Sequence, residues 1–202
     1  EWTPIRQQRN AIESKILEID SRKDAVLSIS IKLGGMFVLA GNEAGLCAFE
    51  AEMPQLQEGF PMRLPNHAAF HSKLQLPVAA KGRAGLSESL FLQPELPLID
   101  GRGAIWNPKA SNLTTLYEYT LGHQVVETFD FTKAIRTAAL EYMPDMFIVL
   151  GPGTTLGGAT AQGLLLANWR GLNTKTEFKA AQTAQPILAS MGMPEQRRML
   201  NE

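Results

Sequence analysis

One histidine in this chain has neighbours that suit acid–base chemistry. His71 lies in residues 64–72, LPNHAAFHS, directly after Phe70 and before Ser72. Imidazole titrates near pH 6.5 when unperturbed, so it can take up and return a proton at neutral pH. The Phe70 ring can shield the imidazole from water, and the small residues at 68–69 leave room for an acyl group. We interpret His71 as a candidate general base, with an ordinary loop histidine as the alternative.

Two segments together resemble a known family. Residues 64–72 resemble the histidine loop of malonyl-CoA:acyl-carrier-protein transacylases and polyketide acyltransferase domains, where Pro-x-x-Gly-Ala-Phe-His-Ser carries the catalytic base. Residues 147–153, FIVLGPG, resemble the family's late strand and Gly-Pro-Gly loop, in the family's order and near its spacing. The family's nucleophile lies in Gly-His-Ser-Leu-Gly, and residues 1–202 contain no Gly-x-Ser-x-Gly. The resemblance therefore implies the carboxy-terminal part of an acyltransferase.

The resemblance also implies roles for single residues. Residues 122–133 resemble the family's Gln-Leu-x-x-Pro-Val-x-Trp segment, in which a glutamine main-chain carbonyl orients the histidine through Nδ1–H. Gln124 matches the glutamine, whereas Thr128 stands in place of the proline and Phe131 in place of the tryptophan. In related polyketide acyltransferases, phenylalanine before the histidine accompanies malonyl units. Phe70 therefore implies a substrate pocket with no room for an α-methyl group.

Composition describes an ordinary globular protein with 45% hydrophobic and 19% charged residues. The net charge of −1 provides no basic surface for nucleic acid, and no apolar run approaches the ~20 residues of a membrane helix. The single cysteine, Cys47, excludes an intrachain disulfide and a cysteine-based zinc site, and it fits a reducing compartment. We expect a cytoplasmic protein with no cofactor and no metal. The chain begins at Glu1 rather than Met, so we expect it to be processed or truncated.

Residue periodicity predicts a small α+β unit followed by a larger α/β unit. The first unit is expected to contain a helix over 5–19, strands over 25–31 and 36–40, a helix over 43–53 and an extended piece over 62–65. The second is expected to contain a helix within 72–90, a strand over 96–99, helices over 113–125 and 131–143, a strand over 145–150 and a helix over 154–169. The continuous apolar run at 145–150 predicts a buried parallel strand.

These patterns and the resemblance give an α/β fold class. Residues 1–66 are expected to form a ferredoxin-like small subdomain, and residues 67–202 the carboxy-terminal part of an α/β-hydrolase-like acyltransferase core. The family moves malonyl from malonyl-CoA to a serine and then to the phosphopantetheine thiol of acyl carrier protein, in fatty-acid or polyketide biosynthesis. The resemblance thus implies His71 as base, Gln124 as its orienting residue, and a serine supplied by an amino-terminal acyltransferase segment.

Two alternatives remain open from the sequence. The missing nucleophile favours a non-catalytic fragment that only binds a carrier or partner protein. An unrelated α/β enzyme would instead pair His71 with a serine of this chain, such as Ser72 or Ser87, although neither lies in an elbow sequence.

Overall fold

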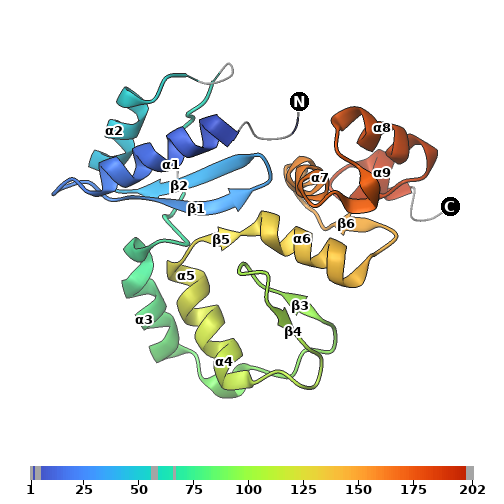
Figure 1. Cartoon of the computed structure of the whole chain (residues 1–202). Coiled ribbons are helices and arrows are strands. Elements are labelled where there is room, and N and C mark those ends of the chain that lie inside the picture. Colours follow the sequence, from blue (N-terminus) through green and yellow to red (C-terminus); the bar gives the residue numbers. More distant parts are fainter. Residues whose placement is uncertain (1, 3–5, 56–58, 66, 199–202) are drawn as a thin grey trace.

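The computed structural model describes residue 2 and residues 6–55, 59–65 and 67–198. The chain begins with a helical layer on a small sheet (Figure 1). Its elements are α1 (Arg6–Asp20), β1 (Leu27–Leu33), β2 (Met36–Gly41) and α2 (Glu43–Glu52). The predicted order is confirmed, with bounds within two residues. The apolar stripes of both helices face the hairpin and enclose a core of Ile16, Ile19, Leu27 and Phe49.

The first sheet takes its third strand from far along the chain. β1 pairs antiparallel with β2 and parallel with β5 (Phe129–Asp130), giving the order β2-β1-β5. The expected extended piece at 62–65 forms no strand, so that prediction was wrong. The Thr128 hydroxyl donates to the Ile29 carbonyl at 2.7 Å, which ties β5 to β1. Sheet formation here therefore depends on residues from both sides of the predicted boundary at 66/67.

The middle of the chain lies below this sheet in Figure 1 and consists of helices and a short β-hairpin. Its elements are η1 (Lys73–Gln75), α3 (Leu76–Gly85), η2 (Glu88–Leu90), β3 (Leu98–Ile99), β4 (Ile105–Trp106), α4 (Leu113–Glu118), η3 (Tyr119–His123) and α5 (Gln124–Val126). The last three make one continuous helix over 113–126, as predicted, with a π-helical turn over 119–123. β3 and β4 form a short hairpin.

The last part of the chain packs helices around a two-stranded parallel sheet. Its elements are α6 (Phe131–Tyr142), β6 (Phe147–Val149), α7 (Leu156–Leu166), η4 (Trp169–Gly171), α8 (Lys175–Ala184), β7 (Leu188–Ser190) and α9 (Pro194–Arg198). α6 crosses from β5 to this sheet (Figure 1). The core contains Leu164, Leu165, Trp169, Phe178 and Ile187, among others. The elements after residue 172 were not predicted, because that stretch has no strong periodicity.

β6 is parallel, as predicted, but it is not buried. Ile148 is 49% exposed and Leu150 is 77% exposed. The apolar run predicted layers that cover both faces of this strand, and these exposures show that the cover is incomplete. Within the same part of the chain, no helix is long and apolar enough to cross a membrane.

The side chain of Asn42 connects the residues before β1 to the start of α2 by hydrogen bonds, and replacing Asn42 tests that connection. Its Oδ1 accepts the N–H groups of Gly45 and Val26, both at 2.9 Å, and its Nδ2 donates to the Asp24 carbonyl. We expect Asn42→Ala to lower the free energy of unfolding by about 1–3 kcal/mol, because a helix cap and a strand partner are lost together. Urea unfolding measures this loss.

Asn10→Ala is the matched control, because Asn10 is exposed within α1. It should change stability by no more than about 0.5 kcal/mol, the scale of helix propensity. Equal effects of the two substitutions would contradict the capping role of Asn42.

Candidate active site

His71 is attached twice to the end of the helix over 113–126. Its backbone N–H donates to the Val125 carbonyl at 2.9 Å, and its Nδ1 lies 2.5 Å from the Gln124 carbonyl oxygen. A carbonyl has no proton to give, so Nδ1 carries the hydrogen of this bond. In the neutral ring, Nε2 then has the free lone pair. The structure thus brings His71 and Gln124 together and leaves one ring nitrogen available as a base.

The helix can hold this histidine because its last carbonyls have no helical donors. The final bond of the helix runs from the Glu127 N–H to the His123 carbonyl, and Glu127 is already extended at φ −117° and ψ 153°. The carbonyls of Gln124 and Val125 come next in line and are left unpaired by the helix.

The backbone of His71 adopts an uncommon conformation that this attachment stabilises. His71 has a φ of 58°, in the left-handed region that non-glycine residues rarely enter. Such residues occur where surrounding contacts hold them and are frequent at active sites. The two bonds to residues 124 and 125 supply those contacts here. They aim the ring back over the helix end rather than along the loop.

Two buried hydroxyls hold the loop on either side of His71. Ser72 is 3% exposed, and its Oγ donates to the Ala69 carbonyl at 2.6 Å. Ser30 of β1 is 6% exposed, and its Oγ donates to the Phe70 carbonyl at 3.0 Å. The Ser72 hydroxyl is therefore engaged in loop structure, and Ser87 caps η2 through a bond to the Ser89 N–H. Neither arrangement resembles a serine activated by His71.

Two phenylalanine rings flank the imidazole. The Phe129 ring centroid lies 5.3 Å from that of His71 at 45°, and the Phe70 ring lies 6.5 Å away at 59°. The side chain of Phe70 is 45% exposed. Sequence reasoning missed Phe129. Its only signal was a large aromatic residue between Gln124 and the next helix.

A turn at 100–104 supports Phe129 from behind. Gly101 donates its N–H to the Tyr119 Oη at 2.8 Å and accepts the Asp130 N–H at 2.8 Å. A Cβ atom at Gly101 would lie 2.4 Å from the Phe129 ring. Only glycine therefore allows this close approach of turn and ring.

Asp100 shapes that turn with a buried carboxylate. Its oxygens accept hydrogen bonds from the Arg102 guanidinium at 2.6 Å and from the backbone N–H groups of Arg102 at 2.8 Å and Ala104 at 3.0 Å. Burial alone would raise the pKa of Asp100, but the Arg102 guanidinium and the two N–H groups outweigh it and hold the pKa below its usual range. The carboxylate is therefore charged at neutral pH and fixes the turn.

The side chains of the other two histidines have other partners. His67 is exposed, with Nδ1 2.8 Å from the Pro65 carbonyl. His123 stacks on Tyr119 with ring centroids 5.7 Å apart. The described residues contain no cluster of histidine, cysteine and carboxylate side chains that could hold a metal ion.

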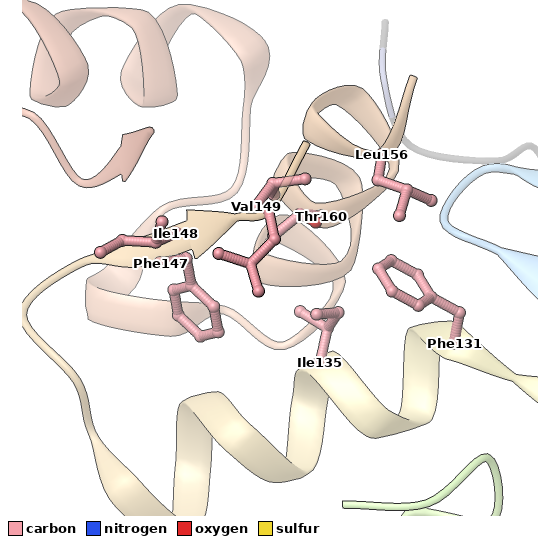
Figure 2. A pocket seen from close by; sticks show the side chains of 8 residues that line it. Phe131, Ile135, Phe147, Ile148, Val149, Leu156 and Thr160 are labelled. Atoms are coloured by element: carbon pink, nitrogen blue, oxygen red, sulfur yellow. The ribbon is translucent and has the colours of Figure 1, made fainter. Parts of the chain in front are cut away.

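A separate apolar pocket of about 240 Å³ lies between α6, β6 and α7 (Figure 2). Its walls include Phe131, Ile135, Val149 and Leu156, and the side chain of Thr160 points toward it (Figure 2). The Thr160 Oγ1 is buried without a hydrogen-bond partner among the described residues. Phe131, at the position of the family's tryptophan, is thus a wall of this pocket.

Comparison with known proteins identifies the fold. No family model matches the sequence, and no curated protein matches it. The acyl-carrier-protein S-malonyltransferase of Burkholderia pseudomallei 1710b superposes with a TM-score of 0.64 at 18% identity, over 95% of this chain and 55% of that one. FabD of Acinetobacter baumannii superposes with a TM-score of 0.57 at 15% identity, over 87% and 54%.

The chain thus spans about 55% of the length of the malonyltransferase that it resembles. This agrees with the carboxy-terminal part predicted from the sequence, and it confirms the resemblance at the level of the fold. The α/β fold class is confirmed with it. A complete hydrolase-like core and a ferredoxin-like subdomain remain expectations.

The contact between Gly101 and Phe129 can be tested directly. Gly101→Ala should lower the free energy of unfolding by about 1–3 kcal/mol, because the new methyl group must displace the Phe129 ring. The ring signals of His71 in NMR spectra should shift with it, since Phe129 is its neighbour.

Gly82→Ala provides the control, because nothing lies within 4 Å of a Cβ atom at this position in α3. It should stabilise the protein by up to about 1 kcal/mol through helix propensity and leave His71 unchanged. Unshifted His71 signals in Gly101→Ala would disprove the support role of the turn.

Proposed function

We propose that this chain is the carboxy-terminal portion of an acyltransferase that moves malonyl from malonyl-CoA to the phosphopantetheine thiol of acyl carrier protein. The observation that carries the proposal is the double attachment of His71 to the Gln124 and Val125 carbonyls, which leaves Nε2 free. The likeness of the fold to the Burkholderia malonyltransferase supports the same reading. The pathway would be fatty-acid or polyketide biosynthesis.

In this proposal His71 transfers protons in both halves of the reaction. Its Nε2 takes the proton of a serine hydroxyl as that oxygen attacks the malonyl thioester, and returns the proton to the departing thiolate of coenzyme A. In the second half, the ring takes the proton of the carrier thiol as its sulfur attacks the acyl-serine, and gives that proton to the serine oxygen as the C–O bond breaks. Gln124 is the positioning residue that keeps the proton on Nδ1.

The serine must come from outside residues 1–202, because no Gly-x-Ser-x-Gly occurs in them. We propose an amino-terminal acyltransferase segment that carries Gly-His-Ser-x-Gly. The same absence favours the second candidate function, a non-catalytic fragment that binds a carrier or partner. The two candidates differ in whether His71 matters once the serine is supplied.

Supplying that serine tests the base. Residues 1–202 alone should form no acyl-enzyme with radiolabelled malonyl-CoA, because the covalent route lacks its nucleophile. Mixed with the amino-terminal portion of the Burkholderia malonyltransferase, the chain should transfer malonyl to acyl carrier protein. In that mixture His71→Ala should slow transfer by about 10²–10⁴-fold.

His67→Ala is the control, since His67 is exposed and bonded only to its own loop among the described residues. It should transfer at the parent rate. Binding of carrier without His71-dependent transfer would instead favour the non-catalytic fragment. A hydroxylamine-labile adduct on the isolated chain would contradict the need for a second segment.

Phe70 is proposed as the residue that selects malonyl. Its ring lies 6.5 Å from the His71 ring and is partly exposed, so it can fill the space of an α-methyl group. Phe70→Ser in the reassembled enzyme should raise kcat/KM for methylmalonyl-CoA relative to malonyl-CoA. The change should be within the roughly 10–200-fold that one methyl group can provide.

Comparison with Phe60→Ser separates selection from general loss of apolar surface. Phe60 is 44% exposed, close to the exposure of Phe70. Its replacement should leave the ratio of the two kcat/KM values unchanged. An unchanged ratio in Phe70→Ser as well would remove Phe70 from the substrate pocket.

A further inference from the structure

Strand β1 contains one irregularity, at Ser30. Between Ile29 and Ile31, β1 advances by two residues while the facing strand β2 advances by one, which makes Ser30 the extra residue of a β-bulge. Bulges are frequent beside active sites, where they redirect a side chain. The hydroxyl of Ser30 is buried and reaches the carbonyl of Phe70, the residue before His71. The bulge therefore places a hydrogen-bond donor next to the candidate base.

The same short stretch of β1 also holds the segment that follows the helix over 113–126. The Ile29 carbonyl accepts the Thr128 hydroxyl at 2.7 Å, and Ile31 pairs with Phe129 of β5. The resembled family has proline where this chain has Thr128, and proline has no hydroxyl to form such a bond. The position of the bulge relative to the helix end is thus fixed by contacts of this particular chain.

The peptide unit between Phe70 and His71 is held at both of its polar groups. Its carbonyl accepts the Ser30 hydroxyl at 3.0 Å, and its N–H donates to the Val125 carbonyl at 2.9 Å. A peptide unit is planar, so bonds to its two opposite sides fix its rotation about the neighbouring Cα atoms. That rotation sets the φ of His71, which is 58°. The Ser30 bond therefore acts on the direction in which the His71 ring leaves the backbone.

Ser30 supplies a contact that no other residue replaces. Among the described residues, it forms the only hydrogen bond between residues 67–72 and any distant segment other than the helix end. Without its hydroxyl, the peptide unit before His71 keeps only the bond to Val125 and can turn about it. The φ of His71 can then relax toward negative values, which draws Nδ1 away from the Gln124 carbonyl.

We propose that Ser30 is a positioning residue of the transfer reaction, and that it holds the peptide unit before His71 in the orientation that brings Nδ1 to the Gln124 carbonyl. The bond to Gln124 keeps the proton on Nδ1 and leaves the lone pair on Nε2. Rings that lose this bond carry the proton on Nε2 in part of the molecules, and those rings cannot act as the base. The effect on rate rests on the proposed function, whereas the effect on the ring does not.

The tautomer of the His71 ring tests the proposal on residues 1–202 alone. Nitrogen-15 NMR of the neutral ring measures the ratio of the Nδ1–H to the Nε2–H form. Ser30→Ala should lower this ratio by about three- to tenfold, the scale of one net hydrogen bond. Ser28→Ala is the matched control, because the Ser28 hydroxyl lies two residues earlier on β1 and faces the Ala40 carbonyl of the same hairpin at 3.5 Å. It should leave the ratio unchanged.

Two further variants make the result independent of whether Ser30→Ala folds, which thermal unfolding verifies. Ser30→Cys fills nearly the same space, but its thiol is a weak donor, so it should shift the ratio in the same direction as alanine. Ser30→Thr retains the hydroxyl and should restore the parent ratio. A parent ratio in Ser30→Ala or Ser30→Cys, or a ratio in Ser30→Thr as low as that of the alanine variant, would overturn the proposal.

The rate is measured after the Burkholderia amino-terminal portion supplies the serine. Ser30→Ala should lower kcat by about tenfold at an unchanged KM for malonyl-CoA, because a displaced base slows the chemical step without altering substrate binding. Ser28→Ala should transfer malonyl at the parent rate. A parent kcat in Ser30→Ala despite a shifted tautomer ratio would show that Ser30 does not position the base for transfer.

The outcomes separate this inference from the proposed function. A tautomer ratio that Ser30→Ala shifts, in a chain that transfers no malonyl when the serine is supplied, would support the hold of Ser30 on the ring and count against the function. Transfer that depends on His71, with a parent ratio and a parent rate in Ser30→Ala, would support the function and overturn the role of Ser30.

Discussion

The carboxyl end of the helix over 113–126 is the constraint from which the site is built. Helices leave their last carbonyls without donors, and here the main chain and the ring of His71 provide them. One contact sets the proton on Nδ1, and the other stabilises the left-handed backbone of His71. The π-helical turn over 119–123 lies just before the two carbonyls, and such turns are frequent at functional sites.

The surroundings of His71 serve to keep that helix end in place. Ser30 and Thr128 attach the histidine loop and the segment after Gln124 to the same strand, β1. Asp100 fixes a turn whose glycine supports Phe129 from the other side. Segments that are distant in sequence therefore hold the loop, the helix end and the Phe129 ring that surround the imidazole. Each connection uses a buried hydroxyl, carboxylate or backbone group, whose hydrogen bonds are costly to leave unmade.

A second feature of the structure is the exposure of apolar side chains at the β6–β7 sheet. The parallel sheet has two strands among the described residues, and Ile148 of β6 and Leu150 just after it are 49% and 77% exposed. At β7, the side chains of Gln182 and Gln196 bond to backbone groups of Leu188 and Ser190. The backbone of β7 is therefore bonded by side chains of this chain as well as by β6.

Sequence alone determined the local elements and the identity of the candidate base. Helical periodicity placed α1, α2, α4 to α6 and α7, a run of β-branched residues placed β1, and apolar runs placed β2 and β6, because these patterns depend on neighbours a few residues apart. Resemblance of short motifs selected His71, Gln124 and Phe70.

Only the tertiary structure decided what the local pattern does not encode. The pairing of β5 with β1, the role of Phe129 and the partial exposure of β6 each depend on residues far apart along the chain. A continuous apolar run indicates a strand whose two faces are both covered by other layers. Whether cover is present depends on how many layers the same chain supplies, and in the described residues Ile148 of β6 stays half exposed.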